Sequence, residues 1–458
     1  MIAAMNRFPV PFTLCNAPAL PPTLRCQRTR RRAALCWLLS FPLLLVFAGC
    51  NKPNFAWIES FKKKAGPEPI HVGILHSQTG TMAISETPLR HAEILAIEEI
   101  NKAGGVLGRQ LEPFVKDGHS RQDHFQLRAT DLIEKDQVAV VFGCWTSADR
   151  KAVLPIFEQS NKLLFYPLQY EGNESSRNVF YSGSTPNQQI LPAIDWFLSD
   201  EGGNKKKIFL IGSDYVYPRT ANYIVKKYLG TKSVNVAGEV YVPLGHRDFG
   251  SVIEKILEAQ PDLILSTING DSNIQFYRNL HERGITASQL PVVATSVGEG
   301  ELRVLPPEIT QGHYAAWSYF QSVDSAENQK FVKSYKREYG HDRVLDDPME
   351  AAYAQVYLWK QAVEKAGTTD TDAVRKVLEA GMEANAPGGR GRMDGKTHHM
   401  HKRFRLGRIR GDRQFDIVYE SADTIAPEPY PEFAFPGWSC DWTRGGMKKG
   451  PVVDVNGQ

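Results

Sequence analysis

Residues 138–172, VAVVFGCWTSADRKAVLPIFEQSNKLLFYPLQYEG, contain two short apolar runs separated by a helix-like segment. The runs are Val138–Phe142 and Leu163–Tyr166, and the segment between them is Ala148–Ser160. This order predicts a right-handed βαβ unit, in which the carboxyl ends of two parallel strands meet at one edge of a sheet. The polar and aromatic residues that follow the two runs at this edge are Trp145, Thr146, Ser147, Tyr166, Gln169 and Tyr170.

The residues at this edge indicate contact with a small polar ligand. Ligands of open α/β sheets bind outside the carboxyl ends of the strands, and hydroxyls, an amide and aromatic faces converge there. Ordinary loop residues without a ligand are the alternative interpretation, and the stretch alone does not decide between the two.

Strand-like and helix-like segments alternate along most of the chain. The expected strands are 71–75, 111–116, 138–142 and 163–166 in a first series and 207–211, 234–241 and 263–267 in a second. The expected helices are 89–101, 123–136 and 148–160 in the first series and 187–199, 218–229, 249–259 and 273–283 in the second. Such alternation predicts parallel sheets with helices on both faces. We therefore expect two α/β lobes, with helices 326–339 and 348–366 returning to the first lobe.

The second lobe also carries polar and aromatic residues beyond its strands. Tyr215 and Tyr217 follow the strand 207–211, and Asp271 follows the strand 263–267 within the sequence INGDSN. The two lobes could therefore face one another across a cleft. Asp271 could equally be the cap of the helix that follows it.

Residues 386–404, APGGRGRMDGKTHHMHKRF, contain glycines and three histidines. The glycines would suit a phosphate-binding turn, and His398, His399 and His401 would suit a metal site, but no carboxylate or cysteine spacing supports either. We expect a flexible turn and a solvated loop here, with no metal and no cofactor. The tail from residue 421 is expected to lie along the surface.

The amino-terminal segment has the layout of a secretory signal. Residues 1–49 contain six arginines and no acidic residue, and they end in the apolar run 33–47. The sequence FAGC ends at Cys50 and resembles a bacterial lipoprotein cleavage box, so we expect Cys50 to be lipidated. An uncleaved anchor helix is the alternative. Without these arginines, 48 basic and 51 acidic residues remain, and nothing in the pattern indicates nucleic-acid binding.

Two cysteines remain for the folded part, Cys144 and Cys440. A disulfide between them is possible in an oxidising compartment, but spacing in the sequence does not supply its geometry. Cys144 could also be a nucleophile. A buried structural thiol is the preferred interpretation, because no His or Asp stands close to it in the sequence.

Several long strings of this chain resemble one known family. They are GCWTSADRKAVLPIFEQSNKLLFYPLQYEGNESSRNVFYSGSTPNQQ, GSDYVYPRT, PMEAAYAQVYLW, APGGRGRMD and FDIVYESADTIAPEPYP, and the similarity runs from about residue 69 to residue 429. They resemble the branched-chain-amino-acid type of periplasmic binding protein, and within it the urea and short-chain amide subgroup of bacterial ABC transporters.

The resemblance implies an α/β fold of the two-lobed type I periplasmic binding protein class. Each lobe would be a parallel sheet flanked by helices, and three hinge crossovers would allow the lobes to close on a ligand. The expected parts are a signal peptide at 1–49 ending at a lipobox, a tether at 50–67, lobe I at 68–183 plus 317–386, lobe II at 184–316 plus 387–420, and a C-terminal tail at 421–458.

The resemblance also implies positions for the binding site. Trp145 and Ser147 match an aromatic residue and a ligand-contacting serine of related amide-binding proteins, and Tyr166 with the two residues after Pro167 matches a second contact loop. Leu168 replaces a small hydroxyl residue of those proteins, which argues against acetamide-type selectivity.

The chemistry of urea agrees with these residues. Urea is flat and uncharged, with one strong acceptor and four N–H donors, so it needs several acceptors, one or two donors and aromatic walls. The expected ligand-binding residues are Trp145, Ser147, Tyr166, Gln169, Tyr170, Tyr215, Tyr217 and Asp271.

We therefore expect a monomeric, non-enzymatic binding protein anchored by Cys50 to a membrane and facing the periplasm. It would capture urea or a short-chain amide and deliver it to the permease subunits of an ABC transporter. An amide-sensing regulatory protein of the same fold and a branched-chain amino-acid binding protein are the alternatives. No Ser-His-Asp arrangement or metal motif favours a hydrolase.

Overall fold

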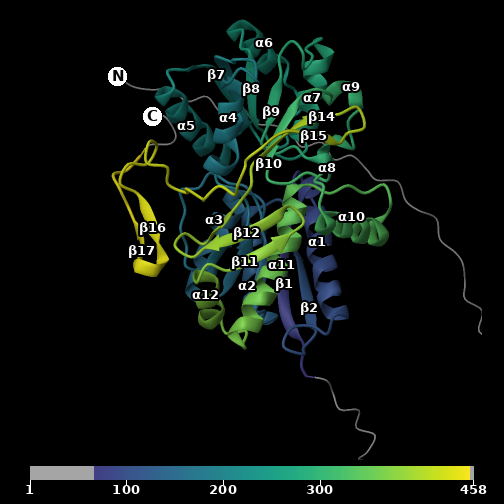
Figure 1. The fold of residues 1–458 in the computed structure, drawn as a ribbon, viewed down its shortest axis with the longest axis vertical. Coiled ribbons are helices and arrows are strands. Elements are labelled where there is room, and N and C mark those ends of the chain that lie inside the picture. The colour runs from purple at the N-terminus through teal and green to yellow at the C-terminus, as the bar shows by residue number, and fades with distance from the viewer. Residues whose placement is uncertain (1–66, 454–458) are drawn as a thin grey trace, which may run out of the picture. The chain divides into compact units, whose positions relative to one another are not determined.

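The computed structural model describes residues 67–453, so the predicted signal peptide and Cys50 lie outside the described residues. No helix within 67–453 is long and apolar enough to cross a membrane. This part of the chain forms two lobes, each built on one mainly parallel sheet with helices on its faces (Figure 1). The two-lobed α/β architecture predicted from the sequence is thereby confirmed.

The first lobe contains a sheet of eight strands in the order β11-β12-β13-β5-β4-β3-β1-β2. Neighbours from β13 to β2 pair in parallel, whereas β11 and β12 are antiparallel to their neighbours. The strands are β1 (Ile70–His76), β2 (Leu111–Asp117), β3 (Val140–Gly143), β4 (Leu163–Tyr166), β5 (Val179–Tyr181), β11 (Glu383–Ala386), β12 (Gly389–Asp394) and β13 (His399–His401).

Six α-helices accompany this sheet, and α1 packs along α11. They are α1 (Ala83–Lys102), α2 (Gln122–Thr130), α3 (Ser147–Ser160), α10 (Ala326–Tyr339), α11 (Asp347–Ala366) and α12 (Thr371–Glu379), and a π-helical turn at Asp131–Lys135 extends α2. Helix α1 begins earlier than the expected residue 89. Its first turn is held by tertiary hydrogen bonds, since Ser85 Oγ donates to Glu301 and Glu86 accepts from the Ser77 backbone.

The second lobe contains a sheet of seven strands in the order β15-β14-β10-β9-β8-β6-β7. Its strands are β6 (Lys207–Ser213), β7 (Asn235–Val242), β8 (Leu263–Thr267), β9 (Val292–Ala294), β10 (Tyr314–Trp317), β14 (Arg405–Ile409) and β15 (Phe415–Glu420). Its helices are α4 (Ile190–Leu198), α5 (Val216–Thr231), α6 (Gly250–Ala259), α7 (Ser272–Glu282), α8 (Glu299–Leu302) and α9 (Pro307–Thr310), with a 3₁₀ turn at Pro186–Gln188 before α4.

Strand β6 shows why this sheet is covered on both faces. Ile208 and Leu210 belong to one buried cluster, whereas Phe209 and Ile211 belong to another. Successive side chains of a strand point to opposite faces, so a continuous apolar run needs helices on both sides.

The chain passes between the two sheets three times. It leaves the first sheet after β5, returns after β10 through α10–α12, and leaves again between β13 and β14. Ser182, Ser318 and Lys402 are the residues that directly follow β5, β10 and β13.

The structure corrects two expectations for residues 387–404. Strands β12 and β13 belong to the sheet of the first lobe, so the second lobe resumes at β14 rather than at residue 387. His398 and His399 do not lie in a solvated loop, because both are buried and stack on Phe180 and Tyr181. The glycines of this segment suggested a turn. Residues 399–401 instead form strand β13, because they pair with β5, which lies far away in the sequence.

The C-terminal tail contacts both lobes. Tyr430, Ala434 and Phe435 are buried in a core cluster of the second lobe. On the first lobe, the Asn173 backbone N–H donates to the Pro429 carbonyl at 2.7 Å. The tail ends in a hairpin of β16 (Ser439–Asp441) and β17 (Gly446–Lys448), joined by a 3₁₀ turn at Trp442–Arg444. It therefore runs over the two lobes (Figure 1). Its apolar side chains insert into the second lobe.

We predict that Gly172→Ala destabilises the protein through this tail contact. Gly172 has φ +70°, and a Cβ there would lie 2.5 Å from the Pro429 carbonyl oxygen. The free energy of unfolding should fall by roughly 1–3 kcal/mol in guanidinium denaturation. Gly367→Ala is the matched control, because Gly367 has φ +69° and a Cβ added there would meet no atom within 4 Å. Equal losses in the two variants would show that the tail contact is unimportant.

Candidate ligand-binding site

The amino terminus of α3 presents the first predicted site residues. Thr146 is the N-cap residue of α3, and its Oγ1 accepts from the Asp149 backbone N–H at 3.0 Å. Trp145 and Ser147 flank this cap and are both buried. An N-cap hydroxyl satisfies one of the N–H groups that the first helical turn leaves unpaired.

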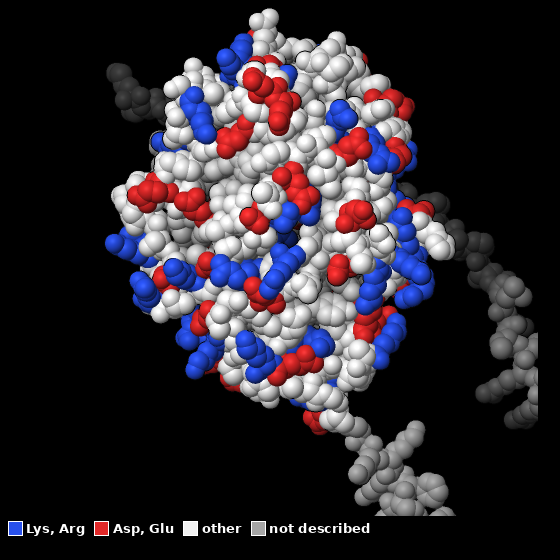
Figure 2. Space-filling model, viewed as in Figure 1, with Lys and Arg blue, Asp and Glu red and all other residues white. Residues whose placement is uncertain are grey.

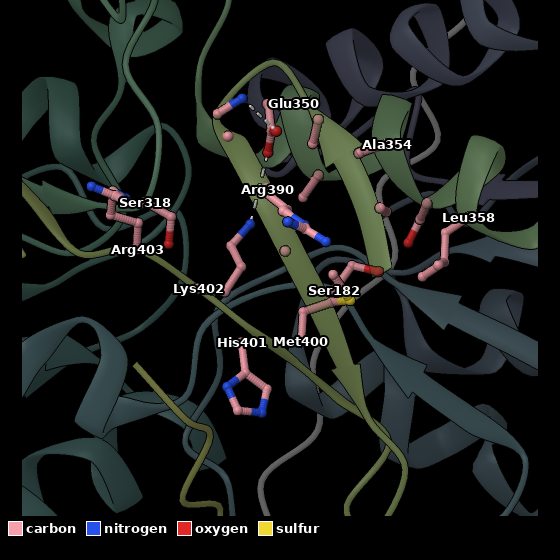
Figure 3. Close-up of a pocket in the computed structure, with 17 residues that line it drawn as sticks. Ser182, Ser318, Glu350, Ala354, Leu358, Arg390, Met400, His401, Lys402 and Arg403 are labelled. Carbon is pink, nitrogen blue, oxygen red and sulfur yellow. Dashed lines mark hydrogen bonds and ion pairs between the residues drawn. The ribbon is translucent and has the colours of Figure 1, made fainter. Parts of the chain in front are cut away.

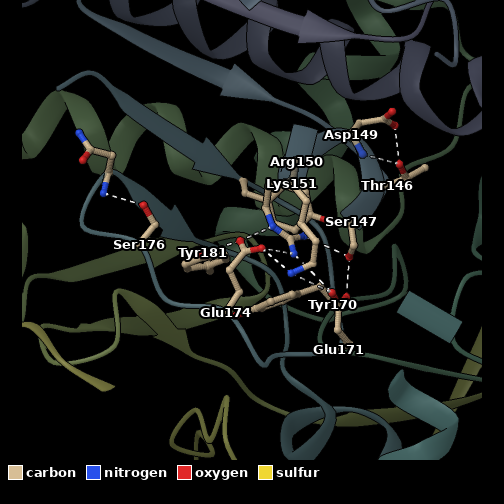
Figure 4. A network of polar contacts seen from close by, with 12 residues as sticks. Thr146, Ser147, Asp149, Arg150, Lys151, Tyr170, Glu171, Glu174, Ser176 and Tyr181 are labelled. Atoms are coloured by element: carbon tan, nitrogen blue, oxygen red, sulfur yellow. Dashed lines mark hydrogen bonds and ion pairs between the residues drawn. The ribbon is translucent and has the colours of Figure 1, made fainter. Parts of the chain in front are cut away.

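Ser147 is held inside a polar network (Figure 4). Its Oγ donates to Glu171 Oε2 at 2.5 Å and accepts from Arg150 Nη1 at 3.1 Å. The hydroxyl proton is thereby used, so Ser147 can offer a ligand only an additional acceptor lone pair.

Arg150 is the centre of that network. Its buried guanidinium donates to Glu174 from Nε at 2.6 Å and from Nη2 at 3.2 Å, and it lies 4.5 Å from the ring centroids of both Tyr166 and Tyr170. Burial alone would raise the pKa of Glu174, but Arg150 and Lys151 outweigh it and hold that pKa well below its usual range. The ion pair is therefore maintained in the interior.

Tyr166 and Tyr170 have different surroundings. Tyr166 lies against Arg150, and its hydroxyl donates to the Trp145 carbonyl at 2.5 Å. The ring of Tyr170 stacks on the ring of Tyr181 with 5.0 Å between the ring centroids, and the Tyr170 hydroxyl is hydrogen-bonded to His399 Nε2. We expected Tyr170 to close on a ligand, but its ring and hydroxyl are engaged within the first lobe, so we place it outside the candidate site.

Gln169 joins the two lobes. Its Nε2 donates to the Thr295 carbonyl at 3.0 Å and to Ser296 Oγ at 2.8 Å, both just beyond β9 of the second sheet. Tyr217 reaches the same place, because its hydroxyl lies 2.8 Å from Thr295 Oγ1. Burial raises the pKa of Tyr217 to about 12, so this hydroxyl stays protonated at neutral pH.

Tyr215 lies between this group and the solvent. The residue is half-buried, and burial of its hydroxyl together with neighbouring Tyr166, Tyr217 and Glu171 raises its pKa well above the usual value. Tyr215 also lines an open groove of about 730 Å³ with Met82 and Asp149 of the first lobe. Residues of both lobes therefore line this groove beside Tyr215.

Two buried acceptors in this group have no hydrogen-bond partner within residues 67–453. They are Gln169 Oε1 and Glu171 Oε1, two residues apart in the loop after β4. Glu171 Oε1 lies 3.6 Å from Arg150 Nη2 and 3.9 Å from Lys151 Nζ, which is ion-pair range without a hydrogen bond. A buried acceptor left unpaired costs about 1–3 kcal/mol, and a ligand with N–H donors would remove that cost.

Asp271 is set apart from these residues. It stands at the N-cap position of α7 but makes no capping hydrogen bond, and its buried Oδ1 has no partner in the described chain. The adjacent Gly270 packs on Thr81 and Met82 of the first lobe. No hydrogen bond or ion pair among residues 67–453 links Asp271 to Gln169 or Glu171. It lies at a second contact between the lobes.

Both folded cysteines are free thiols. Cys144 is fully buried, and burial raises its pKa well above the usual value, which opposes a role as a nucleophile. Cys440 is half-buried in the tail and contacts Ser175 Oγ. No group of three or more His, Cys, Asp or Glu side chains in the described part of the chain is placed to hold a metal ion.

Sequence reasoning did not identify three of the residues at this site. Thr295 and Ser296 follow the apolar strand β9, and the strand-end rule used elsewhere would have found them. Glu171 stands inside the stretch 138–172, but nothing in its spacing showed that Ser147 and Arg150 would hold its carboxylate.

Comparison with known proteins identifies the family. The family model described as "Periplasmic binding protein domain" matches residues 70–435. A leucine-, isoleucine-, valine-, threonine- and alanine-binding protein of Pseudomonas aeruginosa is 24% identical over 330 residues, which cover 68% of this chain and 83% of that protein. A 119-residue stretch is 34% identical to limonene hydroxylase of Geobacillus stearothermophilus, but it covers only 26% of this chain and 21% of that protein.

A solved structure shares the fold. The solute-binding protein of an ABC transporter from Rhodopseudomonas palustris, in complex with 3,4-dihydroxybenzoic acid, superposes with a TM-score of 0.70 at 22% identity, covering 78% of this chain and 98% of that one. The family match over most of the chain, together with the two lobes built on mainly parallel sheets, shows that this chain belongs to the periplasmic binding protein family.

Proposed function

We propose that this protein is the substrate-binding component of an ATP-driven urea uptake transporter. It captures urea, or a close short-chain amide, between its lobes and delivers it to the permease subunits. The observation that carries the proposal is the pair of unpartnered buried acceptors, Gln169 Oε1 and Glu171 Oε1, beside the tyrosines of the second lobe.

The chemistry of these groups suits urea. Its N–H groups can donate to Gln169 Oε1 and Glu171 Oε1, and its carbonyl can accept from a tyrosine hydroxyl of the second lobe. Tyr166 and Tyr215 supply aromatic surface for a flat molecule. A ligand held this way contacts both lobes and therefore favours their closed arrangement.

The site is less suited to ligands with a carboxylate, such as the amino acids or aromatic acids bound by the proteins compared above. A buried carboxylate needs a cation or several donors. Arg150 and Lys151 are the cations in ion-pair range of Glu171, and both already pair with Glu174. A branched-chain amino acid therefore remains the second candidate, with Glu171 as the group that would bind its ammonium.

A regulatory amide sensor with the same lobes is the other alternative. Such a protein would act on a partner in the cytoplasm, whereas residues 1–49 have the layout of an export signal. The export signal and Cys50 favour a binding protein held at the outer face of a membrane.

Ligand preference provides the first test. Titration calorimetry of the purified protein should show saturable binding of urea, weaker binding of acetamide, and no binding of leucine or 3,4-dihydroxybenzoate at comparable concentrations. Leucine binding tighter than urea would replace the urea proposal by the amino-acid alternative.

The role of Glu171 provides a second prediction. In Glu171→Gln the side-chain oxygen should keep the Ser147 hydrogen bond, so the amide NH₂ would face the N–H groups of urea. We expect the dissociation constant to rise at least about tenfold, or about 1.4 kcal/mol. Glu201→Gln, at an exposed residue, is the control and should leave the affinity unchanged. Unaltered affinity in Glu171→Gln would remove this carboxylate from the site.

Membrane attachment provides a third prediction. We propose that a lipid on Cys50 anchors the protein, so Cys50→Ser should move it from the membrane fraction to the soluble fraction after cell lysis. Retention of the variant in membranes would instead support an uncleaved anchor helix. Cys440→Ser serves as the control, since Cys440 lies in the folded tail and should not affect fractionation.

A further inference from the structure

A second cavity lies in the first lobe, and its lining residues are not those of the candidate cleft site. Its volume is about 50 Å³, and it lies between α11 and the strands β12 and β13 (Figure 3). One water needs about 10–15 Å³ of such volume, so the cavity has room for about three to five waters or for one molecule of the same total size.

All three crossovers between the lobes contribute to the wall of this cavity. Ser182, Ser318 and Lys402 line it, and each directly follows the strand at which the chain leaves one sheet for the other. An occupant would therefore contact the segments that must change when the lobes move apart.

Two buried polar groups of the wall have no partner in the described chain. They are Ser182 Oγ and Gln355 Oε1, on residues that are only 5% and 1% exposed. Gln355 Nε2 is used, because it donates to Glu93 Oε1 at 3.1 Å. The wall thus offers one hydroxyl and one carbonyl-type acceptor to an occupant.

The charged groups of the wall are already balanced. Lys402 Nζ lies 3.7 Å from Glu350 Oε2, and the Gly388 backbone N–H donates to Glu350 Oε1 at 2.9 Å. Arg390 forms an ion pair with Glu383, and Arg403 forms one with Glu420. A charged occupant would therefore leave one charge unbalanced, whereas a neutral polar molecule would not.

We propose that this crossover cavity is a second binding site, for a small uncharged amide or urea-type molecule. Its carbonyl accepts from Ser182 Oγ, and its N–H group donates to Gln355 Oε1. The proposal does not rest on the function proposed for the cleft, because none of its residues belongs to the cleft site. With so few ligand atoms, binding is expected to be weak, with a dissociation constant that is roughly millimolar.

Two methionines allow the sites to be observed separately. Met400 lines the crossover cavity and Met82 lines the groove of the cleft. In protein carrying ¹³C-methyl methionine, titration with urea should shift the Met400 methyl resonance along a saturable curve, with a midpoint different from that of Met82. Met400→Leu and Met82→Leu assign the two resonances.

Three variants and one control test which site produces each methyl shift. Ala354→Leu, which fills the cavity from α11, should abolish the Met400 shift and leave the Met82 curve unchanged. Ala366→Leu on the same helix, outside the cavity, is the control. Ser182→Ala should raise the Met400 midpoint about fivefold without filling the cavity. Ser147→Ala should affect only the Met82 curve.

The outcomes separate the two proposals. A saturable Met400 shift without a Met82 shift would support the crossover site and contradict urea binding in the cleft. A Met400 shift that is linear, that shares the Met82 midpoint in every variant, or that survives Ala354→Leu would overturn the second site. Water alone in the cavity of crystals grown in about 100 mM urea, well above a roughly millimolar dissociation constant, would also overturn it.

Discussion

The buried guanidinium of Arg150 is the interaction on which the binding loop depends. It holds Glu174 with two hydrogen bonds, contacts Ser147 and lies 4.5 Å from the ring centroids of Tyr166 and Tyr170. Removing one partner of a buried ion pair costs about 3–5 kcal/mol, because the other charge is left unpaired in the interior. The loop after β4 is therefore fixed by charge as well as by packing, and the positions of Gln169 and Glu171 follow from it.

The network reaches far beyond its own helix. Tyr170 and Tyr181 stack with His399 of β13, a strand that lies far along the chain from both. Burial lowers the pKa of His399 to about 3, so this imidazole stays neutral in the stack. Strand β13 also continues into the third crossover. The same packing therefore connects the binding loop to the segment around which the lobes would move.

Some polar groups of the candidate site already have hydrogen-bond partners within the protein, whereas others have none. The hydroxyls of Ser147 and Tyr166 use their protons within the first lobe, whereas Gln169 bridges to Thr295 and Ser296 and keeps its own oxygen free. In the binding proposed above, the free acceptors would oppose closure without a ligand, and a donor-rich ligand would favour it. This is the energetic condition for a binding protein whose closed form depends on its ligand.

Local apolar periodicity was enough to predict the two α/β lobes, the strand ends that carry polar residues and most helix positions. The same strand-end reasoning indicated Ser147, Tyr166, Gln169, Tyr215 and Tyr217, all of which lie around one interlobe contact. Three features came from the folded chain alone: residues 389–401 complete the first sheet, Tyr170 turns toward His399, and Glu171 enters the site. Each of these results from contacts between residues distant in the chain, and no local pattern records which distant partner a buried polar group will meet.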